Sequence, residues 1–222
     1  MSDPTSPAAA AHGFGLVPLE CPTCGAALAA SGEDVVYYCT ACRNGYRYQP
    51  EEPHLARLEV LFVAAANIAA ERYLPFWVLA AQVEVRNRRA GRTMPDLFQA
   101  LFGGGGGRGR TPTGDVQFVV PAFQADLDST VELARRYTRE FPSLGERLGE
   151  RLVGGCYGVD DARKLAHFAV LAGEIDEPDV VKSIEVSIRF GDARLLGVPF
   201  VRAGDGWQDA IYAIRTLDVD RP

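Results

Sequence analysis

The sequence lacks an apolar run long enough to cross a membrane as a helix. Such a helix needs about 18 or more consecutive, mainly apolar residues. The longest candidate, residues 60–70, carries Asn67 within it and is followed by Glu71. The sequence therefore predicts a protein without an integral membrane segment.

The chain also lacks a recognisable export signal. Residues 1–20 are rich in alanine and proline but contain no basic segment followed by an apolar core. Disulfide bonds persist in oxidising compartments. We therefore expect a cytoplasmic protein whose cysteines do not form structural disulfides.

Positive charge is scarce relative to negative charge. The chain has 23 Lys and Arg residues against 29 Asp and Glu residues, which gives a net charge of −6 at pH 7. A nucleic-acid-binding protein normally presents a basic face, because neutralising phosphates supplies much of its affinity. The best basic patch is residues 86–92, which is either a solvated hairpin tip or a docking site for phosphate or an acidic partner.

Two Cys-x-x-Cys motifs, at residues 21–24 and 39–42, are separated by 14 residues. Four thiolates are a donor set for tetrahedral zinc, at Zn–S distances of about 2.3 Å. Gly25 suits the tight turn after the first motif. The β-branched and aromatic run at 35–38 predicts a strand that leads into the second motif. Residues 18–50 thus resemble the zinc-ribbon family.

The resemblance implies one Zn²⁺ ion held by Cys21, Cys24, Cys39 and Cys42. Two disulfides or an iron site of the rubredoxin type are alternatives, but rubredoxins use a longer spacer with aromatic and acidic residues around the metal. Four protein ligands close the coordination sphere, so the predicted role of the metal is structural. A segment this small buries too little apolar surface to fold without it.

Composition divides the chain into three parts. Residues 1–17 are predicted to be a disordered tail, residues 18–50 the zinc ribbon, and residues 51–222 an α+β domain. The boundary is the polar junction at 49–53, which contains two prolines. This division predicts two separate cores, so that losing Cys39 unfolds the ribbon alone.

The third part mixes strand and helix patterns. Strand patterns occupy residues 73–86, 116–123, 181–190 and 194–201, with turns expected at 191–193 and 204–206. Helices are expected to begin near Asp126 or Asp128 and at Asp160, since carboxylates suit a helix N-terminus. Residues 55–68 fit either a helix or a strand. The pattern predicts an α+β fold with a mainly antiparallel sheet.

Three strand patterns carry a proline followed closely by an aromatic residue, at residues 75–77, 121–123 and 199–200. Proline cannot donate to a strand ladder, so each marks an edge, a bulge or a strand entry. The recurrence indicates either an internal duplication or chance in a chain with 14 prolines. Trp77, beside Phe76, belongs either to the core, which we favour, or to a partner-binding surface.

The glycine-rich stretch at 103–114 resembles a phosphate-binding loop only in part. Arg110 stands where that motif has lysine, and the preceding residues 95–102 have a helical pattern instead of a strand. A surface loop is therefore expected, without nucleotide binding.

Candidate catalytic residues are few. Cys156 lies in a glycine-rich segment, and His167 follows on the predicted second helix. A Cys–His nucleophilic pair needs the imidazole beside the thiol, which sequence spacing does not establish. A single cysteine commonly packs as a small apolar residue, so we do not expect an enzyme.

The leading hypothesis is a non-enzymatic adaptor or scaffold that binds a protein partner within a larger cytoplasmic or membrane-peripheral assembly. Its predicted partner-binding residues are Phe76, Trp77, Arg86, Arg88, Arg89 and Arg92. The alternative is a transcription- or RNA-associated zinc ribbon. That protein would bind nucleic acid through Arg43, Tyr46, Arg47 and Tyr48 together with residues 86–92.

Overall fold

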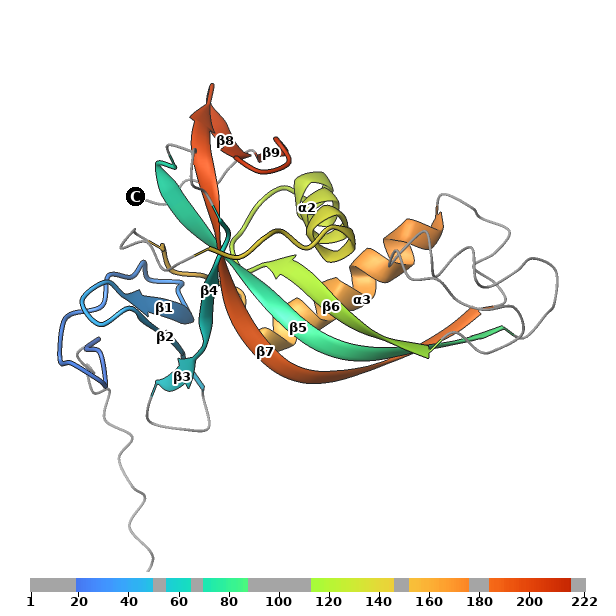
Figure 1. The fold of residues 1–222 in the computed structure, drawn as a ribbon, viewed down its shortest axis with the longest axis horizontal. Helices are drawn as coiled ribbons and strands as arrows, with labels where there is room; N and C mark the ends of the chain where they lie inside the picture. The colour runs from blue at the N-terminus through green and yellow to red at the C-terminus, as the bar shows by residue number, and fades with distance from the viewer. Residues whose placement is uncertain are drawn as a thin grey trace, which may run out of the picture.

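The computed structural model describes residues 19–49, 55–64, 70–87, 113–145, 152–175 and 184–216. The predicted tail, the glycine-rich stretch up to residue 112, and Arg88, Arg89 and Arg92 lie outside these ranges. Within them the chain forms two sheets and two helices (Figure 1). Neither helix is long and apolar enough to span a membrane.

The small sheet has three strands in the order β1-β2-β3. They are β1 (Val36–Cys39), β2 (Asn44–Arg47) and β3 (Ala56–Leu58). The first two form the hairpin expected of a ribbon, with Val36 opposite Arg47. The third strand comes after the predicted junction and pairs with β2, with Leu58 opposite Gly45. The ribbon's sheet therefore continues across the boundary that composition suggested.

The large sheet has the order β6-β5-β7-β8-β9, with β4 beside β7. Its strands are β4 (Val60–Phe62), β5 (Arg72–Asn87), β6 (Thr113–Pro121), β7 (Ile184–Ala203), β8 (Gly206–Asp209) and β9 (Arg215–Thr216). All neighbours are antiparallel except β4 and β7, which run parallel. With helices α2 (Leu127–Arg139) and α3 (Val159–Ile175), this agrees with an α+β fold and a mainly antiparallel sheet.

Side-chain alternation along β5 separates two hydrophobic clusters. Successive strand residues point to opposite faces, so Phe76 and Trp77 belong to different clusters. The cluster on the Phe76 face includes Leu74, Val78, Leu196, and Leu133 and Tyr137 of α2. The cluster on the Trp77 face includes Leu79, Phe118, Leu195, and Ala162 and Ala166 of α3. The large sheet is thus covered on both faces.

Both helices begin where carboxylates predicted them. Asp126 is the N-cap of α2, and its Oδ1 accepts a hydrogen bond of 2.8 Å from the Ser129 backbone N–H. Asp160 and Asp161 lie in the first turn of α3. These carboxylates compensate the positive end of each helix dipole.

The predicted turn at residues 191–193 is wrong. Strand β7 continues through it, because the sheet absorbs the glycine as a bulge: Leu79 pairs with Ala193, but Ala81 pairs with Phe190. One extra residue of β7 therefore lies opposite Ala80. The predicted turn at 204–206 is confirmed, with Gly204 at φ 68° between β7 and β8.

The three prolines gather at one end of the paired strands. Pro121 is the last residue of β6 and pairs with Phe76, so Pro75 lies just beyond the β5–β6 ladder. Pro199 lies opposite Tyr73 on β7. Strand pairing explains this arrangement, and the internal duplication stays a prediction.

The ribbon packs on the main body of the molecule, both on the large sheet and on the segment that precedes α3. In that segment, Gly155 and Val36 of the ribbon exchange backbone hydrogen bonds in both directions, each 3.0 Å long. Val36 and Tyr38 belong to the same hydrophobic cluster as Trp77. The ribbon also has a small cluster of its own, around Tyr46. One face of the ribbon thus packs around the cysteines, and the other packs against the main core.

Candidate metal centre

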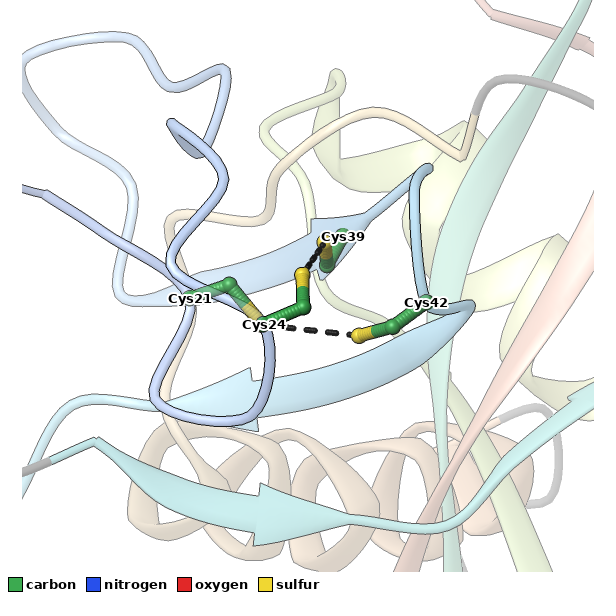
Figure 2. Close-up of side chains that lie close together, drawn as sticks. All are labelled: Cys21, Cys24, Cys39 and Cys42. Carbon is green, nitrogen blue, oxygen red and sulfur yellow. Dashed lines mark hydrogen bonds between the residues drawn. The ribbon is translucent and has the colours of Figure 1, made fainter.

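The fold brings all four predicted ligands together (Figure 2). Their Sγ atoms all lie within 4.8 Å of one another. Cys21 Sγ is 3.4 Å from Cys42 Sγ, and Cys24 Sγ is 3.6 Å from Cys39 Sγ. A tetrahedron with Zn–S distances of about 2.3 Å has sulfur–sulfur edges of about 3.8 Å. The cysteines are not joined by disulfides, so donor chemistry and spacing both fit one tetrahedral metal ion.

Two tight turns present these thiols. In the first, the Gly25 N–H donates to Cys21 O over 2.8 Å, and Gly25 adopts φ 72°, as the sequence predicted. In the second, the Arg43 N–H donates to Cys39 O over 2.7 Å. Arg43 has φ 58°, a left-handed conformation uncommon for a residue with a side chain. Both turns therefore contain a residue with positive φ, which is glycine in the first turn and arginine in the second.

Polar side chains of β2 contact two of the sulfurs. The Tyr46 hydroxyl lies 3.2 Å from Cys21 Sγ and is hydrogen-bonded to Thr23 Oγ1 at 2.6 Å. Asn44 Nδ2 donates to Cys42 Sγ over 3.2 Å. Arg57 of β3 in turn donates to Asn44 Oδ1 over 2.9 Å. Such outer partners orient metal ligands and tune their basicity.

Sequence reasoning did not identify Asn44, Tyr46 and Arg57 as partners of the ligands. A signal existed for the first two, because they alternate along β2 and so share the face that bears the cysteines. Arg57 gave no such signal, since its position depends on the pairing of β2 with β3. Tyr46 was expected to contact nucleic acid in the alternative hypothesis, but its side chain is 1% exposed. Tyr48, in contrast, is 52% exposed.

The thiols differ in acidity. Burial works to raise the pKa of Cys21, but hydrogen bonds from Tyr46 and from the backbone of Thr23 and Cys24 lower it to about 6. A backbone hydrogen bond from Ala26 works to lower the pKa of Cys24, but burial and the neighbouring thiols raise it to about 12. Cys21 and Cys24 therefore share negative charge unequally, because a thiolate at one opposes ionisation of the other. A divalent cation at the centre of the four thiols removes that repulsion, which makes metal binding and loss of protons parts of one event.

The other predicted site residues that the structure describes are Phe76, Trp77 and Arg86. They lie on β5 of the large sheet, whereas the metal ligands lie in and beside the small sheet. Phe76 and Trp77 are both 0% exposed, and Trp77 Nε1 donates to Tyr157 O over 2.8 Å. Of the two roles that the sequence left open for Trp77, core packing fits this burial, and neither side chain presents surface to a partner. Arg86 lies in β5, where its backbone pairs with Glu185.

The two candidate catalytic residues are Cys156, which lies before α3, and His167, which lies within it. Cys156 precedes the helix and is half-buried. The His167 ring packs edge-on against Phe190, with 5.5 Å between ring centroids. In the described part of the chain, the four cysteines are the one group of three or more potential metal ligands that come together.

Comparisons with protein-family models, with curated proteins and with solved structures find no match. The structure itself shows four cysteines positioned to bind a metal ion, consistent with a zinc-ribbon-like site, on a small sheet that is joined to a sheet-rich body by strand pairing and a shared core.

Proposed function

We propose that the chain is a zinc protein with a structural metal, acting as a non-enzymatic adaptor that binds a protein partner in a larger cytoplasmic or membrane-peripheral assembly. The observation that carries the proposal is the closed donor set of Cys21, Cys24, Cys39 and Cys42. Four protein ligands leave a tetrahedral ion without an open position for water or substrate. The metal then contributes by cross-linking the two turns.

The surroundings of the thiols support a structural zinc site. Asn44 donates to Cys42 Sγ, and the Tyr46 hydroxyl contacts Cys21 Sγ, so side chains of a paired strand adjoin two of the sulfurs. The face of the ribbon that points away from the cysteine cluster packs against the main core through Val36. A metal that fixes the ribbon therefore also fixes the surface that ribbon and sheet present together, which is what an adaptor requires.

Two measurements test the proposal. Elemental analysis of protein purified without added metal should find one zinc ion per chain, and iron would contradict the zinc assignment. The tagged protein, isolated from its native cell, should also retain partner chains through washes at moderate salt, and these chains should be the same in repeated purifications. A zinc-loaded protein that retains no partner, or that turns over a substrate in a metal-dependent way, would contradict the adaptor role.

A further inference from the structure

A solvent-open cavity of about 670 Å³ lies where the ribbon, the large sheet and α3 meet. Four arginines line it, and each comes from a different element: Arg47 of β2, Arg57 of β3, Arg163 of α3 and Arg194 of β7. Of the described residues on its wall, Glu59 and Asp192 carry carboxylates. The lining is thus positive in a chain with a net charge of −6, so we call it the arginine cavity.

The arginines are poorly neutralised by the protein itself. Among the described residues, the side chains of Arg47 and Arg194 have neither a hydrogen-bond nor an ion-pair partner. The Nε atoms of Arg47 and Arg163 are buried without an acceptor. Arg163 does pair with Asp160 through Nη1, at 2.9 Å. A buried N–H without an acceptor costs free energy, and an anion in the cavity would supply both acceptors and counter-charge.

A backbone irregularity shapes one wall. The bulge in β7 lies at the cavity, with Gly191 and Asp192 on the extra length and Ala80 opposite. Bulges often occur beside functional sites, where they redirect side chains. Here only Ala193 separates the bulge from Arg194, which the same strand carries into the cavity lining.

The lining indicates the chemistry of a ligand. Sites for drug-like molecules are mostly apolar and aromatic, whereas none of the described residues lining this cavity is aromatic. The described part of the lining therefore offers a nucleobase no ring to stack on. Guanidinium groups match phosphate oxygens with paired, charge-assisted hydrogen bonds. Several of them in one cavity suit a ligand with more than one phosphate group.

We propose that the arginine cavity binds a compact small molecule carrying two or more phosphate groups. Its guanidinium groups hold the phosphates, and Glu59 and Asp192 accept hydrogen bonds from donors elsewhere on the ligand. This site is distinct from the metal centre and does not depend on the adaptor role. Arg57 connects the two places, since it also bonds Asn44 beside Cys42.

Calorimetric titration of the full, zinc-loaded chain with inorganic pyrophosphate tests the proposal. Arg194→Gln and Arg163→Gln should each weaken binding about tenfold, the effect of losing a charge-assisted hydrogen bond. Arg194→Lys should retain part of the affinity, since the charge stays while the paired geometry is lost. Arg57 is left unchanged in these variants because it contacts the metal network.

Arg189→Gln is the matched control, because Arg189 is an exposed residue of the same strand and does not line the cavity. Its variant should bind pyrophosphate as the native chain does. Circular dichroism and zinc content establish that each variant is folded, and Arg47→Gln replaces any variant that is not. Equal loss in Arg189→Gln, or equally tight binding of sulfate at matched ionic strength, would overturn the proposal.

A second titration distinguishes the phosphates of a small molecule from those of a nucleic-acid backbone. We expect pyrophosphate to bind, and single-stranded RNA to bind the native chain no better than it binds Arg194→Gln. RNA binding that is steeply salt-dependent and lost in the cavity variants, with no binding of pyrophosphate, would assign the cavity to nucleic acid instead.

Discussion

At the scale of single residues, the hydroxyl of Tyr46 is the clearest addition to the four ligands. It is buried beside Cys21 and Thr23, and its loss leaves the sulfur of Cys21 without that polar partner. Tyr46→Phe should therefore weaken zinc retention about 10- to 100-fold, as the loss of an outer partner commonly does. Competition with a metal chelator measures this effect.

Tyr48→Phe is the control for that substitution, because Tyr48 lies on the same segment with 52% of its side chain exposed. It should leave zinc retention unchanged. If both variants retain zinc as the native chain does, the contact between Tyr46 and Cys21 has no influence on the metal.

Tyr137 gives the molecule a dependence on alkaline pH. Burial, together with the adjacent Asp209 carboxylate at 2.6 Å, raises the pKa of this phenol well above its usual range. The folded state keeps the proton while the unfolded state releases it near pH 10. The stability is fully present below that pH and falls above it, by up to about 1.4 kcal/mol per pH unit for one such group.

Denaturant unfolding at pH 9 and pH 11 measures the loss. Tyr137→Phe should make stability less dependent on pH between these values, although Tyr37 and Tyr212, whose pKa values burial also raises, still contribute. An identical fall in the variant and the native chain would show that Tyr137 is not the source.

At the scale of elements, the contact between ribbon and sheet depends on two adjacent glycines. A Cβ on Gly155 would lie 2.8 Å from Ala122 O, and one on Gly154 would lie 2.1 Å from Asp34 Oδ2. The ribbon approaches the body this closely because neither position carries a side chain.

Gly155→Ala should consequently lower the free energy of unfolding by about 1–3 kcal/mol, the usual cost of overpacking. Gly32→Ala is the control, since a Cβ there has nothing within 4 Å. Thermal unfolding followed by circular dichroism compares them. Equal stability of the two variants would mean that the ribbon shifts away at little cost.

Elements also show which parts of the fold the sequence could predict. Helix starts at Asp126 and Asp160 and the cysteine turns were predictable because their signals lie within a few residues. The parallel pairing of β4 with β7 was not, since Phe62 and Gly197 are far apart in the chain. The bulge at Gly191 was mistaken for a turn because glycine serves both structures.

At the scale of the whole molecule, composition predicted two separate cores, whereas the structure joins them through Val36 and Tyr38. A proline-containing junction indicates a linker, but it carries no information about the strand that follows or about distant contacts such as Val36 with Gly155. The same limit applied to the metal centre. Its ligands were predictable from spacing, and Arg57 was not.

The metal centre and the large sheet are expected to unfold as parts of one cooperative structure. Amide hydrogen exchange, compared between the zinc-loaded native chain and Cys39→Ser, measures whether they do. We expect faster exchange in β1 and β2 and also around Trp77 in β5, because Val36 and Tyr38 pack in the same core as Trp77. Acceleration confined to residues 19–49, with β5 protected as before, would contradict the claim and restore an independently folding ribbon.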